Sequence, residues 1–211
     1  MNKRFVYNPR LLKNTIHVAC VGDSITYGYT LLPRRKKCYP TKLQKMLGKR
    51  YLVGNFGVTG ATLQTHGNKP YSKSRNFKYS TQFLPHIVIL MLGTNDSKMI
   101  NWRGVDAFRC DYLDLIAHYR SLPSCTQIYL MTPATSYLQD TVNPFPSTIS
   151  ESVIEEITKE VLQIATEQKL PCIDIHELTH AHPEYFLLDG IHPNSNGALA
   201  IAKEVYLALR H

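Results

Sequence analysis

The sequence lacks the features that mark several classes of protein. Its five cysteines are widely spaced, odd in number and without a C-x-x-C pair, so neither a disulfide framework nor a four-thiolate zinc site is predicted. No run of about 20 apolar residues occurs, and no short apolar run precedes a small-residue cleavage site near Met1. We therefore expect a cytoplasmic protein without a membrane-spanning helix.

Two glycine motifs of common enzyme folds are missing as well. G-x-G-x-x-G does not occur, and Thr26 stands where G-x-S-x-G would need its second glycine after Gly22. A dinucleotide-binding fold and an α/β-hydrolase elbow are both disfavoured. Internal repeats and interdomain linkers are also lacking, and 211 residues with 44% hydrophobic side chains suit one globular domain. We expect a single domain over residues 1–211.

Charge of one sign is in excess, because 24 lysines and arginines against 16 acidic residues give a net charge of +8. The excess lies in two groups: Arg34, Arg35, Lys36, Lys37, Lys42, Lys45, Lys49 and Arg50, then Lys69, Lys73, Arg75 and Lys78. It indicates either a solvated basic face or a field that steers anionic substrates, with Arg34 and Lys36 as candidate substrate-binding residues. Neither a nucleic-acid module with stacking aromatics nor a membrane-docking segment is recognisable, so we expect neither partner.

Short β-branched runs alternate with longer amphipathic stretches, which is typical of parallel strands joined by crossover helices. The predicted strands are Ile16–Val21, Tyr51–Phe56, Ile87–Leu92, Thr126–Met131 and Cys172–Ile175. The predicted helices are Tyr39–Leu47, Asp106–Tyr119, Ser150–Gln168 and Ser195–Leu209. We expect a three-layer α/β/α sandwich around a five-stranded parallel sheet. Ligands of such sheets bind beyond the carboxyl ends of the strands, and the long irregular stretch Pro133–Ser147 is a candidate lid or binding wall.

A serine directly follows the first predicted strand, in Gly22-Asp23-Ser24, and we expect a loop before the next helix. This position puts Ser24 at the carboxyl edge of the sheet. A serine hydroxyl is a poor nucleophile at neutral pH, so it needs a base, an orienting acid and donors for an oxyanion. Asp23 is interpreted as a cap of the loop or helix.

Those groups are available at other strand ends. In Asp189-Gly190-Ile191-His192, a carboxylate three residues before an imidazole can accept the Nδ1 proton and leave Nε2 free for Ser24. Gly60 can offer a backbone N–H, and the Asn95 amide a neutral side-chain donor, to the oxyanion. Each glycine-rich turn could alternatively serve only a tight connection between a strand and a helix.

Taken together, GDSITYG, NFGVTGAT, LGTNDS and DGIHPN resemble the motifs of the SGNH hydrolases, also called GDSL esterases. The resemblance implies a flavodoxin-like topology, Ser24 as nucleophile, Asp189 and His192 as its partners, and Gly60, Asn95 and the Ser24 N–H as the oxyanion hole. The stretches VGNFGVTGATL, HGNKPY and IVILMLGTNDSK are similar to bacterial sialate O-acetylesterases and other carbohydrate esterases. No metal or organic cofactor is implied.

The predicted function is therefore that of a serine esterase acting on short-chain carboxylic esters, with O-acetyl groups of a carbohydrate as the favoured substrates. A lysophospholipase or thioesterase is the alternative within the class. A non-catalytic protein that binds an anionic ligand on the same scaffold is the alternative outside it. A zinc peptidase is a third, because His176-Glu177-Leu178-Thr179-His180 matches H-E-x-x-H; its place directly after a strand argues against a zinc helix.

Overall fold

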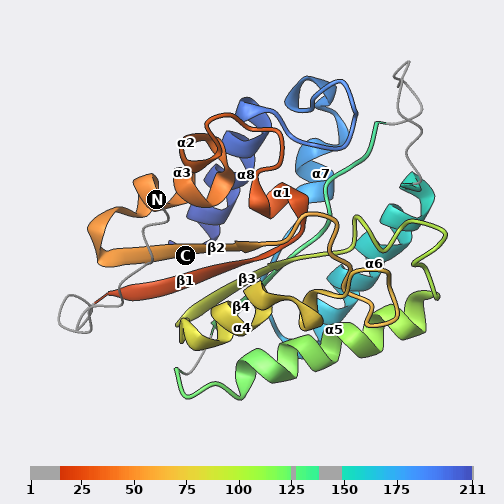
Figure 1. The fold of residues 1–211 in the computed structure, drawn as a ribbon, viewed down its shortest axis with the longest axis horizontal. Coiled ribbons are helices and arrows are strands. Elements are labelled where there is room, and N and C mark those ends of the chain that lie inside the picture. Colours follow the sequence, from red (N-terminus) through yellow and green to blue (C-terminus); the bar gives the residue numbers. More distant parts are fainter. Residues whose placement is uncertain (1–14, 125–126, 138–148, 211) are drawn as a thin grey trace.

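A parallel sheet of five strands runs through the middle of the computed structural model, which describes residues 15–124, 127–137 and 149–210 (Figure 1). The strands are β1 (Ile16–Gly22), β2 (Tyr51–Gly57), β3 (Ile87–Met91), β4 (Gln127–Met131) and β5 (Cys172–Ile173). Their spatial order is β2-β1-β3-β4-β5, the flavodoxin-like order. The predicted fold class is confirmed.

The central strands have both faces covered, as their composition predicts. β3 is buried along its whole length, which is why its sequence IVILM shows no polar alternation. β1 pairs with both neighbours, so that Cys20 lies opposite Asn55 on one side and Ile89 on the other. Its alternate side chains enter two different cores: Val18 and Cys20 lie in one, and Ala19 and Val21 lie in the other.

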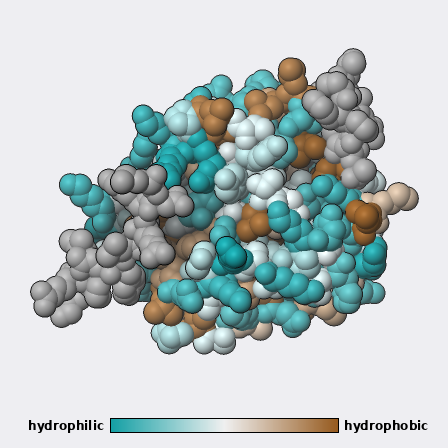
Figure 2. Space-filling model, in the orientation of Figure 1, coloured by the Kyte–Doolittle hydropathy of each residue, from teal (hydrophilic) through white to brown (hydrophobic). Residues whose placement is uncertain are grey.

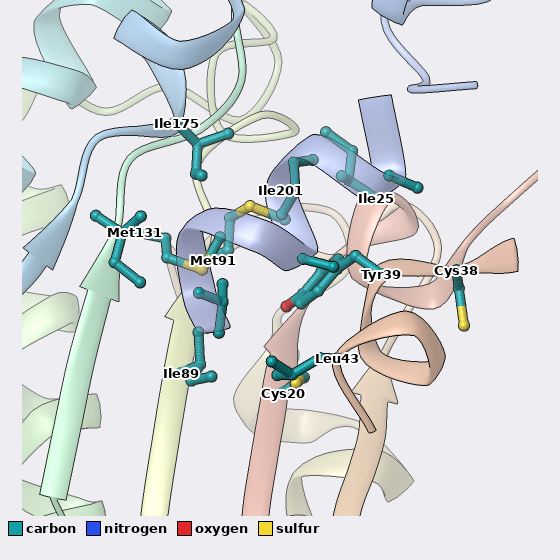
Figure 3. Packing of buried hydrophobic residues seen from close by; sticks show 14 of the residues in the cluster. Cys20, Ile25, Cys38, Tyr39, Leu43, Ile89, Met91, Met131, Ile175 and Ile201 are labelled. Atoms are coloured by element: carbon teal, nitrogen blue, oxygen red, sulfur yellow. The ribbon is translucent and has the colours of Figure 1, made fainter. Parts of the chain in front are cut away.

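Helices cover the two faces of the sheet in two layers (Figure 1). One layer holds α1 (Ser24–Tyr27), α2 (Arg34–Lys37), α3 (Tyr39–Leu47), α7 (Ile175–His180) and α8 (Ser195–Ala208). The other holds α4 (Arg75–Gln82), α5 (Val105–Arg120) and α6 (Glu151–Gln168). In the first layer Tyr39 and Leu43 of α3 and Ile201 of α8 pack against Cys20 and Ile89 of the strands (Figure 3). Burial of these apolar faces is the main force that holds the layers together.

Several short helices were not predicted, because three to eight residues hold too few turns to show a period. The largest local error concerns Ser24: it begins the one-turn helix α1 instead of lying in a loop. The fifth strand was predicted to run to Ile175 but ends at Ile173, because Asp174 accepts the N–H of Glu177 and starts α7. Residues 125–126 and 138–148, with most of the predicted lid, lie outside the described part of the chain.

The surface is mixed in character. Figure 2 shows a largely hydrophilic face on which apolar residues occur in separate small groups. Within the described ranges no helix combines the length and apolarity needed to cross a bilayer. The expected cytoplasmic location stays a prediction.

Candidate active site

Ser24 is fixed at the carboxyl end of β1 by the caps of helix α1. The Asp23 carboxylate accepts the N–H of Ile25 at 2.9 Å, which confirms its interpretation as a cap. Gly28 caps the C-terminal end of the helix, and its positive φ of 82° suits glycine. Because Ser24 is the first helical residue, its own N–H has no partner within α1 and is free to face a ligand.

The structure brings Ser24 together with two residues from the far end of the sequence. The His192 Nε2 atom lies 3.0 Å from Ser24 Oγ, although 168 positions separate them in the chain. On the other side of the ring, His192 Nδ1 lies 2.7 Å from Asp189 Oδ2. With Nδ1 donating to the carboxylate, Nε2 is left as the acceptor for the serine proton. Serine, imidazole and carboxylate thus form one continuous chain of hydrogen bonds.

The Asp189 carboxylate is held by its own turn. Its Oδ1 atom accepts the backbone N–H of Ile191 at 3.0 Å and of His192 at 2.9 Å. Partial burial acts to raise the pKa of Asp189, but the hydrogen bonds from the His192 ring and from these two N–H groups outweigh it and hold the pKa below its usual range. The carboxylate is therefore ionised at neutral pH. The Tyr29 ring packs beside the imidazole, with centroids 5.0 Å apart.

The two predicted oxyanion donors lie in the loops after β2 and β3. Gly60 has a φ of +77°, a backbone conformation that residues with a side chain rarely adopt. The Asn95 amide donates one N–H to the Ala61 carbonyl at 3.1 Å, which ties the two loops together and orients the side chain. An amide has two such donors, so the second N–H remains for a substrate oxygen.

The end of β2 approaches α1 closely. A Cβ atom added at Gly57 would lie 2.2 Å from the backbone nitrogen of Tyr27, so only glycine allows this contact. The neighbouring Asn55 amide donates to the Thr26 carbonyl at 2.8 Å. Together these contacts set the position of α1, and hence of the serine at its start, relative to the loop that carries Gly60.

Two features of the buried residues around the site are not predicted from the sequence: carboxylates with raised pKa values, and an asparagine that supports Asn95. Asp96 is fully buried, and burial raises its pKa to about 7; burial likewise raises the pKa of Asp23 to about 6. Asn101, also fully buried, donates to the Asn95 carbonyl at 2.7 Å. The sequence signal for Asp96 was its place directly after Asn95 at a strand end.

Arg34 and Lys36, the basic candidates for substrate binding, both lie on α2. The Arg34 guanidinium lies 4.2 Å from the centroid of the Tyr27 ring and donates to the Tyr27 carbonyl at 3.2 Å. Lys36 is exposed on α2. No hydrogen bond or ion pair described for either side chain reaches Ser24, and their role in binding substrate stays a prediction.

The H-E-x-x-H motif lies on a helix after all, in α7, contrary to the expectation from the preceding strand. The rings of His176 and His180 stack with centroids 5.8 Å apart. His176 Nε2, however, lies 2.9 Å from Glu151 Oε1, and this hydrogen bond raises the pKa of the imidazole. In the described ranges no group of three or more His, Cys, Asp or Glu side chains is arranged to hold a metal ion.

A small cavity opens beside the serine. It is narrow and is bounded by Ser24 and His192. Its remaining lining is mostly apolar: Ile25, Gly28, Tyr29, Leu31, Tyr39, Pro193, Ala198 and Ile201. The space next to the reacting atoms is therefore small and mostly apolar.

A serine, an imidazole and a carboxylate linked in this way at the carboxyl edge of a flavodoxin-like sheet are typical of serine hydrolases. The chain belongs to the GDSL-like lipase/acylhydrolase family, whose model matches residues 20–200.

Several known proteins are similar to this chain. An acetylxylan esterase from Xylanibacter ruminicola is 32% identical over 96% of this chain, which spans 45% of that longer protein. Among solved structures, the aryl esterase of M. smegmatis matches with a TM-score of 0.74 and 18% identity over 93% of this chain and 99% of that one. A carbohydrate acetylesterase family member from Sinorhizobium meliloti matches with a TM-score of 0.74 and 19% identity, over 93% and 98%. These structural matches show the same fold.

Proposed function

We propose that this protein is a serine esterase that removes short acyl groups, in particular O-acetyl groups of a carbohydrate. The observation that carries the proposal is the hydrogen-bonded chain from Ser24 Oγ through His192 to Asp189, with distances of 3.0 and 2.7 Å. An isolated serine lacks the base that would make it a nucleophile, whereas this one has both a base and a group that orients it.

The reaction proceeds in two steps. Ser24 Oγ attacks the ester carbonyl carbon while His192 Nε2 takes its proton, and the tetrahedral intermediate then expels the alcohol, which receives that proton. Water, deprotonated by the same imidazole, attacks the acyl-enzyme and releases the carboxylic acid and the free serine. Asp189 stabilises the imidazolium that forms in both steps. The N–H groups of Ser24 and Gly60 and the Asn95 amide stabilise the oxyanion.

Two observations support a small acyl group on a sugar. The cavity beside the serine is small and mostly apolar, which suits an acetyl group better than a long chain. The curated relative at 32% identity is an acetylxylan esterase. The partner is thus a small-molecule or glycan ester, and neither nucleic acid nor a membrane is part of the proposed function.

Acetate release from acetylated sugars tests the proposal directly. Acetylated xylo-oligosaccharides and O-acetyl sialic acids are incubated with the wild type and with Ser24→Ala. We expect the wild type to release acetate and the variant to lose nearly all activity, because the nucleophile is missing. A Ser24→Ala variant that is as active as the wild type would refute the serine mechanism.

Acyl-chain length separates the proposed function from its alternatives. We expect p-nitrophenyl acetate to be hydrolysed with a higher kcat/KM than the octanoyl ester. A strong preference for octanoyl would favour the lysophospholipase or thioesterase instead. A protein that hydrolyses neither ester, resists labelling by a fluorophosphonate and binds DNA in a salt-dependent way would be the non-catalytic anion-binding alternative.

A further inference from the structure

The loops after β2 and β3 are joined through a buried carboxylate. Asp96 Oδ2 accepts the backbone N–H of Leu63 at 2.9 Å, and Asp96 Oδ1 accepts that of Gln64 at 2.7 Å. Asp96 has no exposed surface, and the two acceptor bonds use one oxygen each. The carboxylate therefore fixes both the distance and the orientation between two segments more than 30 positions apart in sequence.

Each end of this link lies next to a proposed oxyanion donor. Asp96 follows Asn95 directly in the chain, and Leu63 comes three residues after Gly60. Besides the bond from the Asn95 amide to the Ala61 carbonyl, a further link runs parallel to the Asp96 link. Buried Asn101 donates to the Asn95 carbonyl at 2.7 Å and accepts the N–H of Asn68 at 2.9 Å. The two loops that supply the donors are thus connected through buried side chains.

We propose that Asp96 is a positioning residue for the oxyanion hole: its two hydrogen bonds hold the Gly60 N–H and the Asn95 amide at the separation that the tetrahedral intermediate requires. The inference rests on the proposed esterase function. Asp96 does not touch the reacting atoms and acts only through the loops that it joins.

The chemistry of the side chain explains why a carboxylate occupies this place. An ionised carboxylate is an acceptor through both oxygens, so it can take two converging N–H groups. An asparagine would turn its NH₂ group toward one of those donors and lose that bond. Burying an ionised group is unfavourable, and burial accordingly raises the pKa of Asp96. The hydrogen bonds from the N–H groups of Gln64 and Leu63 act in the opposite direction and favour the ionised form.

The same stretch of chain offers a matched control. Asp111 of α5 accepts the N–H of Thr65 at 2.8 Å, so it makes the same kind of bond to the residue after Gln64. It anchors the loop from α5, however, and makes no link to Asn95. Asp111→Asn therefore removes a carboxylate bond to this loop without separating the two donors.

The experiment compares wild type, Asp96→Asn and Asp111→Asn with p-nitrophenyl acetate. For Asp96→Asn we expect kcat to fall about 10- to 100-fold with KM nearly unchanged, because a displaced donor weakens transition-state binding more than substrate binding. The Ki of a boronic acid, which forms a tetrahedral adduct with the serine, is expected to rise by a similar factor. Asp111→Asn is expected to keep the kcat and Ki of the wild type.

Circular dichroism and melting curves establish that each variant is folded. If Asp96→Asn does not fold, Asn101→Ala, which removes the parallel link, is measured instead with the same expected fall in kcat. Folded Asp96→Asn, or Asn101→Ala in its place, with wild-type kcat and Ki would overturn the inference. So would an equal loss in Asp111→Asn. An inactive wild type would instead contradict the proposed function itself.

Discussion

At the scale of single residues, the orientation of the catalytic side chains depends on individual hydrogen bonds. The turn from Asp189 to His192 supplies both the carboxylate and the ring, and the carboxylate also accepts two backbone N–H groups of that turn. The imidazole is therefore oriented locally, by four consecutive residues. Only its last bond, to Ser24, depends on distant parts of the chain.

Replacing the acid tests this orientation. In Asp189→Asn we expect kcat to fall about 10³- to 10⁴-fold, because an amide no longer stabilises the imidazolium and favours the wrong tautomer of His192. KM is expected to change little. Steady-state kinetics with p-nitrophenyl acetate measure both constants. A loss of less than tenfold would show that Asp189 is not the orienting acid.

The buried carboxylates predict a dependence of stability on pH. Burial raises the pKa of Asp96 to about 7 and of Asp23 to about 6, both above the ordinary value of 3.8. A folded state with a raised pKa binds protons more tightly than the unfolded chain, so stability is lost as the pH rises from about 4 through these values. We expect the Tm of Asp96→Asn to decrease less steeply than that of the wild type between about pH 4 and pH 8. Equal slopes in melting curves would contradict the raised pKa of Asp96.

At the scale of elements, α7 shows how a motif can match one function and serve another. His176 pairs with Glu151 at the start of α6, and the second oxygen of Glu151 accepts the N–H of Ser136 at 2.6 Å. Thr135 donates to the His176 carbonyl at 3.1 Å. These bonds hold α7, α6 and the segment after β4 together, so the histidine has a structural partner.

This arrangement predicts the effect of removing metals. We expect incubation with 1,10-phenanthroline or EDTA to leave the rate of ester hydrolysis unchanged, because the proposed mechanism uses a serine and an imidazole. The measurement is kcat/KM before and after dialysis against the chelator. Inactivation that is reversed by added zinc would favour the zinc peptidase.

At the scale of the whole molecule, the net charge of +8 predicts a positive field around the protein. Such a field attracts anionic substrates at long range and is screened by salt. It does not act on neutral esters. The charge is therefore expected to change the association rate of an anionic substrate more than the rate of the chemical step after binding.

Ionic strength tests this effect. We expect kcat/KM for an ester with a carboxylate on its alcohol to fall about two- to tenfold between low salt and about 0.5 M NaCl, whereas a neutral ester changes little. Lys36→Glu is expected to raise KM for the anionic ester only. If both esters respond equally to salt, the basic face is merely solvated.

The helices and strands show what local sequence can predict. The apolar run of β3 and the long amphipathic pattern of α6 were located to within a residue or two, because burial on one or both faces leaves a period in the sequence. Helices α1 and α7 were not predicted, because each is short and its start depends on a single capping contact, of Asp23 or of Asp174. A cap is one residue and leaves no period.

The sequence by itself determined the layered fold and the residue types of the site, because alternating burial patterns and strand-end motifs are local properties. The motifs predicted that Ser24 meets His192, but only the tertiary structure decided their distance. It alone showed that Asp96 meets the loop after β2 and that His176 meets Glu151. Those meetings depend on the order of strands in the sheet and on which loops share an edge. Both are set by packing across the whole chain, which no single stretch of it encodes.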